Sequence, residues 1–186
     1  MDLYFSEKEL NKAKCSLENM KEIKTNYSAK GLSAFETNWI DFLINLEKVW
    51  KKSELECRNY LNFQPWQGKY QRERRKDPLL KYLKNARDAD QHSLQFITSE
   101  KGYSCEIVYP SNGFILKIGE SIRVIATSED PRIEAEPVEN RKIIYELPIN
   151  HLGKKLINPN DPLEIAELGF NYYEEYLRAI RAKFIK

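Results

Sequence analysis

The sequence predicts an α+β fold: an N-terminal helical bundle, then an antiparallel β-meander, then a C-terminal helix. Two observations support this class. Apolar residues recur every three or four positions up to about residue 100, which is typical of helices that bury one face. Between residues 103 and 150 they alternate with polar residues, as in strands, and after residue 161 the helical interval returns. We therefore expect a bundle over residues 1–100 and a sheet with its closing helix over residues 103–186.

The bundle begins with two predicted helices. The first covers about residues 6–24, where Ser6 and Glu9 have the spacing of a capping box. The second has the same pattern at Ser33 and ends near Cys57. Its wide apolar stripe contains two tryptophans and two phenylalanines, and the simplest role for these rings is packing in the core.

The third predicted helix starts at Asp77, which can cap it, and Pro78, which suits a first helical position. Its apolar stripe extends toward Gly102 and consists of Leu79, Leu83, Ala86, Leu94 and Ile97. The preceding segment, residues 59–68, contains a proline and a glycine and predicts a break in helical structure.

The second part of the chain contains five predicted strands, over residues 103–109, 114–118, 121–127, 133–138 and 142–147. The connections are short, with turn residues at 110–113 and 119–120, so neighbouring strands should pair antiparallel. Asp161 and Pro162 repeat the start of the preceding helix. The helix that they begin could pack on the sheet or dock on the bundle.

The composition argues against several classes of protein. The three cysteines are far apart, which fits neither a disulfide framework nor a zinc site and favours a reducing cytoplasm. The N-terminus lacks the pattern of a signal peptide, and no window approaches about 18 consecutive apolar residues, so we expect no membrane span. The sequence lacks a glycine-rich phosphate loop, a zinc motif and a nucleophile elbow, so neither a metal nor a cofactor is predicted.

Positive charge is concentrated between residues 66 and 87. This segment has eight basic and two acidic residues, whereas the formal net charge of the whole chain is only +2. Lysine and arginine neutralise phosphates, and the interleaved Trp66 and Tyr70 could stack on bases. The alternative is an ordinary solvated surface. If the segment binds RNA, we expect the contacts to come from Lys69, Arg72, Arg74, Arg75, Lys76 and Lys84.

Three polar residues interrupt the third helix: Arg87, Asp88 and His92. Asp88 and His92 are four residues apart, so the carboxylate could orient the imidazole. Arg87 and His92 lie about 140° apart around the helix. Histidine suits acid–base chemistry because its reference pKa is about 6.5, and arginine offers several donors to a phosphate. A surface histidine oriented by a neighbouring acid explains the same pattern without catalysis.

The run from Arg87 to His92, on a late helix of an all-helical half, resembles the motif of the HEPN superfamily. That motif is an arginine, four to six further residues and a histidine, usually with a polar residue directly after the arginine; Asp88 takes that position here. The resemblance covers about residues 1–100. It implies a bundle that dimerises so that two motifs face one cleft. Many members are metal-independent endoribonucleases of toxin, phage-defence or RNA-processing systems, and others only bind.

Three hypotheses follow. The first is a cytoplasmic, metal-independent RNA hydrolase of a toxin–antitoxin or phage-defence system, in which Arg87 holds the phosphate, His92 moves protons and Asp88 orients His92. The second is a non-catalytic module that binds RNA or protein through the basic face of residues 69–87. The third is a structural protein without a nucleic-acid role. The first hypothesis implies three partners: RNA, a second copy docked through the 78–97 helix, and a cognate inhibitor. It implies no association with a membrane.

Overall fold

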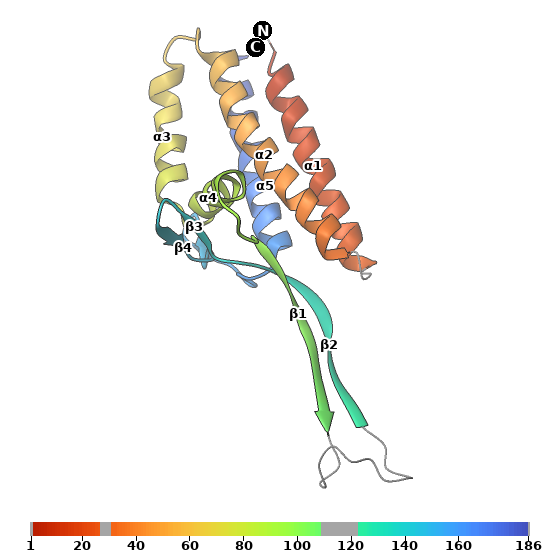
Figure 1. The fold of residues 1–186 in the computed structure, drawn as a ribbon. Coiled ribbons are helices and arrows are strands. Elements are labelled where there is room, and N and C mark those ends of the chain that lie inside the picture. Colours follow the sequence, from red (N-terminus) through yellow and green to blue (C-terminus); the bar gives the residue numbers. More distant parts are fainter. Residues whose placement is uncertain (1, 27–30, 109–122, 186) are drawn as a thin grey trace, which may run out of the picture.

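The computed structural model of the protein describes residues 2–26, 31–108 and 123–185. Within these ranges the α+β class is confirmed, because five helices accompany three antiparallel strand pairs (Figure 1). The helices are α1 (Tyr4–Thr25), α2 (Gly31–Cys57), α3 (Phe63–Lys76), α4 (Pro78–His92) and α5 (Pro162–Phe184). The strands are β1 (Thr98–Val108), β2 (Arg123–Ala135), β3 (Val138–Asn140), β4 (Ile143–Tyr145), β5 (Asn150–His151) and β6 (Lys154–Lys155). None of the helices in the described part of the chain is long and apolar enough to cross a membrane.

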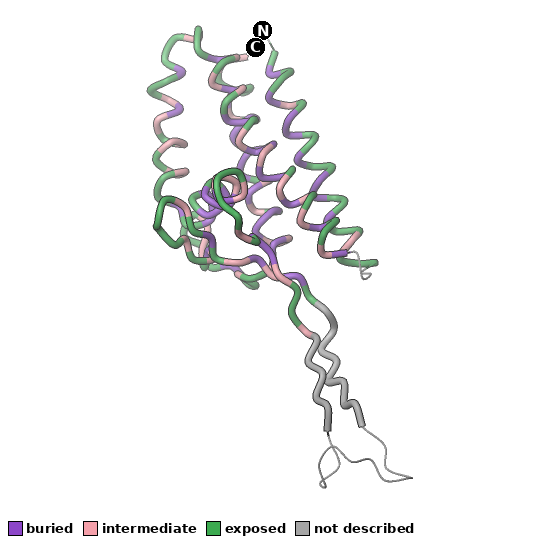
Figure 2. The backbone as a smooth tube through the Cα atoms, in the orientation of Figure 1, coloured by how far each residue is buried: buried purple, intermediate pink, exposed green. Residues whose placement is uncertain are grey.

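The helices pack around one hydrophobic core. α1, α2 and α5 run side by side, and α4 lies across them and is seen almost end-on in Figure 1. Buried positions follow the inner faces of the helices (Figure 2), and the largest of them include Trp39, Phe42 and Tyr176. α5 docks mainly on α1, α2 and α4. The same core includes Ile133 and Val138, so residues from both sides of the boundary expected near residue 100 pack together.

The first two helices begin earlier than their capping patterns indicate. α1 and α2 start two residues before Ser6 and Ser33, so neither serine caps a helix. Ser6 is buried, and its hydroxyl donates a hydrogen bond to Glu56 of α2. Glu9 is buried as well, and its Oε1 lies 2.5 Å from Nζ of Lys52 on α2. These polar groups therefore fasten α1 to α2 instead of ending a helix.

The break predicted over residues 59–68 is confirmed for residues 59–62, which separate α2 from α3, but it is wrong for residues 63–68, which form the start of α3. Pro65 occupies the first turn of the helix, where a backbone N–H would have no intrahelical partner. Aromatic packing against α5 holds the segment in place, since the ring centroids of Phe63 and Trp66 lie 5.5 and 5.2 Å from that of Phe184. Burial of these rings outweighs the local tendency of the proline to interrupt a helix.

α4 begins at the predicted cap, Asp77, but it ends at His92 and not near Gly102. The residue that follows has extended backbone angles, which no helix allows. The predicted apolar stripe is therefore cut. Leu94 lies outside the helix and is exposed, whereas Ile97 packs in the core at the end of the connection to β1.

The strands pair antiparallel as predicted, but they form three separate pairs in place of one continuous meander. β1 and β2 form a long ribbon that extends away from the bundle (Figure 1). β2 includes the start of the strand predicted over 133–138, and β4 lies within the strand predicted over 142–147. The strand predicted over 114–118 and the turns at 110–113 and 119–120 lie outside the described residues.

The two short pairs, β3–β4 and β5–β6, are hairpins with two-residue turns. In both turns each residue has a positive φ: 53° at Arg141 and 65° at Lys142, 47° at Leu152 and 81° at Gly153. This is the geometry of a type I′ turn, which matches the twist of paired strands but usually consists of asparagine and glycine. Three residues with side chains therefore hold a left-handed conformation in these turns.

A buried carboxylate joins the start of α4 to the β5–β6 hairpin. Asp77, whose side chain is only 5% exposed, accepts hydrogen bonds from the backbone N–H of Leu80 (3.0 Å) and of Leu152 (2.6 Å). Its Oδ1 lies 2.9 Å from Nδ1 of His151. Burial opposes ionisation of Asp77, but these hydrogen bonds outweigh it and hold the pKa of the carboxyl below its usual value.

Acid should weaken this contact. The pKa of Asp77 is lower in the folded state than in the unfolded state, where it is about 3.9. The ionised carboxylate therefore contributes its full stabilisation above about pH 3.9, and this stabilisation is lost as the pH falls through the folded-state pKa. We expect Asp77→Asn to reduce the free energy of unfolding by about 1–3 kcal/mol at neutral pH. The difference from wild type should shrink below about pH 4, which urea denaturation over a pH series would measure.

The matched control for this experiment is Asp161→Asn. Asp161 caps α5 as Asp77 caps α4, but its side chain is 24% exposed and has no histidine partner in the described structure. Its replacement should cost less at neutral pH. A loss in Asp77→Asn that stays the same in acid would contradict the role given to its ionised form.

Candidate functional site

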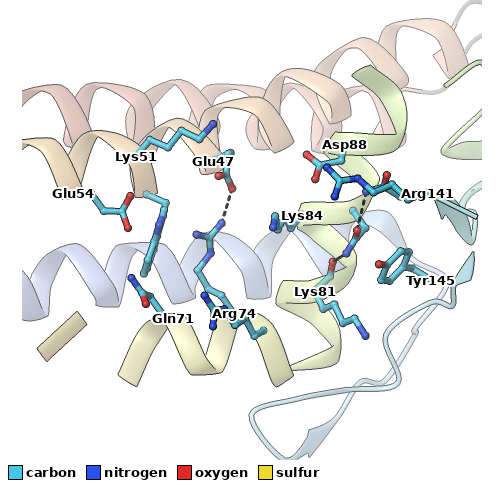
Figure 3. Close-up of a pocket in the computed structure, with 14 residues that line it drawn as sticks. Glu47, Lys51, Glu54, Gln71, Arg74, Lys81, Lys84, Asp88, Arg141 and Tyr145 are labelled. Atoms are coloured by element: carbon cyan, nitrogen blue, oxygen red, sulfur yellow. Dashed lines mark hydrogen bonds and ion pairs between the residues drawn. The ribbon is translucent and has the colours of Figure 1, made fainter. Parts of the chain in front are cut away.

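A pocket of about 550 Å³ lies between α2, α3, α4 and the β3–β4 hairpin (Figure 3). Its lining contains three acidic side chains, Glu47, Glu54 and Asp88, and twice as many basic ones. The basic residues are Lys51, Arg74, Arg75, Lys81, Lys84 and Arg141. The volume is within the range of ligand pockets, and the excess of positive charge favours an anion.

Arg74 forms one wall of this pocket and is largely buried, with 11% of its side chain exposed. Its guanidinium lies 2.5 Å from a carboxylate oxygen of Glu47 on α2, and its Cζ lies 4.3 Å from the centroid of the Trp50 ring. Its Nε is buried without a hydrogen-bond partner among the described residues. Arg74 therefore joins α3 to α2, and Glu47 neutralises most of its charge.

The other basic groups in the pocket keep more of their charge available. In the described part of the chain, five of them have no ion-pair partner: Lys51, Arg75, Lys81, Lys84 and Arg141. The ammonium of Lys81 lies 5.3 Å from the centroid of the Tyr145 ring. Two of the three acids are already engaged, because Glu47 pairs with Arg74 and Asp88 pairs with Arg87 at 2.5 Å. Phosphate groups carry negative charge and several acceptor oxygens, so they are the ligands that such a set of donors fits best.

The three motif residues lie in different surroundings. Arg87 is half-buried, and its guanidinium pairs with Asp88 and donates a 3.1 Å hydrogen bond to Gln91. Asp88 lines the pocket. We expected Asp88 to orient His92, but among the described interactions none joins the two, and the partner of Asp88 is Arg87. His92 is exposed and is the last residue of α4.

The six residues predicted to contact RNA are divided between two surfaces. Three of them line the pocket, namely Arg74, Arg75 and Lys84. The other three lie on the opposite face of α3, in a more open depression of about 440 Å³ beside the β5–β6 hairpin: Lys69, Arg72 and Lys76. The helical period causes this division on α3. At about 100° per residue, Lys69, Arg72 and Lys76 fall within about 60° of one another, whereas Arg74 and Arg75 are centred about 140° away around the helix.

Trp66 and Tyr70, the two rings that could stack on bases according to the sequence, pack within the bundle. Both are half-buried, and their ring centroids lie 4.9 Å apart. The Tyr70 ring is also 5.0 Å from that of Tyr176 on α5. These rings therefore join α3 to α5.

The sequence did not identify Glu47, Lys51 or Arg141 as parts of a site. Glu47 and Lys51 belong to α2, and Arg141 belongs to the β3–β4 turn. In the sequence they are ordinary charges on the polar side of a helix or in a turn. Only the folded arrangement brings them beside the basic residues of α3 and α4.

Comparison with protein-family models, with curated proteins and with solved structures finds no significant match to this chain. Among the described residues, no group of three or more His, Cys, Asp or Glu side chains could hold a metal ion. The geometry and charge of the pocket are therefore the basis for assigning a function.

Proposed function

We propose that this protein binds RNA through the basic pocket, which is the second of the three functions that the sequence suggests. The observation that carries the proposal is the convergence of five basic side chains, from α2, α3, α4 and the β3–β4 hairpin, that form no ion pair with any described residue. A phosphodiester chain offers anionic oxygens at regular intervals, and basic groups that neutralise them release counterions. The resemblance of the α4 motif to the HEPN superfamily supports RNA as the polymer.

Replacing Arg75 and Lys84 together with alanine should weaken the binding of single-stranded RNA and reduce its salt dependence. Each phosphate contact in a single strand contributes about 0.7 to the slope of log K against log salt, so the double variant should lose up to about 1.4. Arg74 is left in place because it supports the fold. The fluorescence anisotropy of a labelled oligonucleotide, titrated at several salt concentrations, measures both the affinity and the slope.

The matched control replaces Lys69 and Lys76 with alanine, which removes the same charge from the other face of α3. If the pocket is the binding site, this control should change the slope much less. An unchanged slope in the Arg75 and Lys84 double variant would contradict the proposal.

A second candidate function is metal-independent RNA cleavage, as in a toxin or phage-defence ribonuclease. It is favoured by the position of the motif, because Asp88 lines the pocket, Arg87 is beside it and His92 is exposed on the same helix. In this mechanism Arg87 would hold the phosphate, and His92 would transfer protons at the 2′-hydroxyl or at the leaving 5′-oxygen. RNA cleavage in EDTA distinguishes this function from binding alone.

Cleavage by these residues would require a second copy of the chain. Arg87 and His92 are separated by roughly 7.5 Å along the helix axis and about 140° around it, which is unsuitable for one site in one copy. Two copies that dock at the C-terminal end of α4 could bring Arg87 of one near His92 of the other. Leu94 and Phe96 directly follow this end, are both largely exposed, and would supply an apolar contact between the copies.

A further inference from the structure

The turn between β3 and β4 has an unusual composition. A two-residue type I′ turn needs a positive φ at both positions and most often consists of Asn-Gly or a similar pair. Here the positions are occupied by Arg141 (φ 53°) and Lys142 (φ 65°), and side chains make this left-handed backbone unfavourable. Such conformations persist where the surrounding contacts enforce them, and they are frequent at ligand sites.

The hairpin that carries this turn is fastened to α4 and to the segment after it. Asn140, directly before the turn, donates a 3.0 Å hydrogen bond to the side chain of Asn85 on α4. The backbone of Glu139 makes two hydrogen bonds, of 2.9 and 2.7 Å, with the side-chain amide of Gln95. Val138 on β3 is fully buried. These contacts hold the turn at the edge of the pocket (Figure 3).

Arg141 lines the pocket, and its side chain extends toward Asp88 on α4 (Figure 3). Among the described residues no ion pair joins the two, and the Asp88 carboxylate pairs with Arg87. Lys84 lies one helical turn before Asp88 and also lines the pocket, whereas Lys142 does not. Arg141 and Lys84 therefore present two unpaired positive charges, from two different elements, to the same cavity.

We propose that the β3–β4 turn is a phosphate clamp, in which Arg141 and Lys84 hold one phosphate group of the bound RNA between the hairpin and α4. This inference rests on the proposed RNA binding. The guanidinium of Arg141 offers a planar fork of donors to two phosphate oxygens, and the ammonium of Lys84 adds a point charge. The left-handed backbone of the turn lowers the stability of the fold, but it places Arg141 in the pocket, where the side chain can contact the phosphate.

Two single replacements in the turn test this clamp. Arg141→Asn and Lys142→Gly each remove one positive charge, and each introduces a residue that a type I′ turn favours. Both should raise the urea concentration at the midpoint of unfolding. Arg141→Asn should weaken the binding of a single-stranded oligouridylate about tenfold or more, because a charge-assisted hydrogen bond is lost. Lys142→Gly, which keeps Arg141, should change the affinity by no more than about twofold.

A second control is Leu152→Asn in the β5–β6 turn, which relaxes the same backbone geometry away from the basic pocket. It should raise the midpoint of unfolding and leave the RNA affinity unchanged. If Arg141→Asn binds the oligouridylate as tightly as wild type does, the clamp is overturned while RNA binding stands. If Arg141→Asn and Lys142→Gly weaken binding equally, the net positive charge of the turn determines the affinity and not the position of Arg141, and the clamp is again overturned. If wild type binds no RNA, the proposed function fails and the clamp fails with it.

Discussion

If the second candidate function holds and the protein cleaves RNA, His92→Ala is expected to slow that cleavage by about 10²–10⁴-fold, measured in EDTA at neutral pH, without unfolding the protein. His92 is exposed at the end of α4, and replacements at such positions usually change stability by no more than about 0.5 kcal/mol. Arg87→Ala should slow cleavage as well, because the phosphate loses its fixed donors. If the 2′-oxygen attacks, as the HEPN resemblance implies, the wild-type products carry a 2′,3′-cyclic phosphate and a 5′-hydroxyl.

The proposed cleavage mechanism requires two copies of the chain, and this requirement allows a sharper experiment on the same residues. Mixing Arg87→Ala with His92→Ala should restore part of the activity, because a mixed dimer has one site that contains both residues. Sedimentation of the wild type at the same concentrations gives the oligomeric state. Cleavage retained in His92→Ala, or cleavage that requires Mg²⁺, would rule out this chemistry.

Arg74→Ala should destabilise the protein more than the loss of any other basic residue in the pocket, by about 3–5 kcal/mol. The replacement leaves the Glu47 carboxylate, which is only 13% exposed, without its partner and removes the guanidinium that covers Trp50. Arg74→Lys should recover only part of the loss, since an ammonium lacks the planar fork of donors. Urea denaturation at neutral pH measures these differences.

Arg75→Ala is the matched control, because Arg75 is the next residue on α3 and is exposed. It should change the free energy of unfolding by no more than about 0.5 kcal/mol. Adding Glu47→Gln to Arg74→Ala removes the unpaired charge and should return part of the stability. A loss in Arg74→Ala no larger than that in Arg75→Ala would refute the structural role of Arg74.

The helix starts that depend on local interactions could be predicted from the sequence. Asp77 and Asp161 cap α4 and α5 as expected, because each carboxylate accepts a hydrogen bond from a backbone N–H no more than three residues away. The capping pattern at Ser6 was misleading because its hydroxyl bonds Glu56, which is 50 residues away. α3 was missed because its proline and glycine suggest a break, whereas burial of its aromatic rings against α5 decides the structure.

The candidate site also depends on contacts between residues that are distant in the sequence, and these could not be predicted. The sequence identified the basic run but not its division between two surfaces, because that division depends on a helix that was not predicted. Arg74 and Arg75 are equivalent neighbours in the sequence, yet a rotation of about 100° buries the first against Glu47 and leaves the second exposed. Arg141 reaches the pocket only through the docking of the β3–β4 hairpin on α4.

The position of α5 in the bundle has a consequence for biosynthesis. α5 packs on α1, α2 and α4, and its Tyr176 ring stacks on Trp50, with 5.1 Å between the ring centroids. While the chain is being translated, the earlier helices emerge first, and their inner faces stay uncovered until α5 has left the ribosome. Such exposed faces attract chaperones and promote aggregation. Because Trp50 and Arg74 line the pocket and Trp50 packs on α5, a nascent chain that lacks α5 would also lack the complete wall of the pocket.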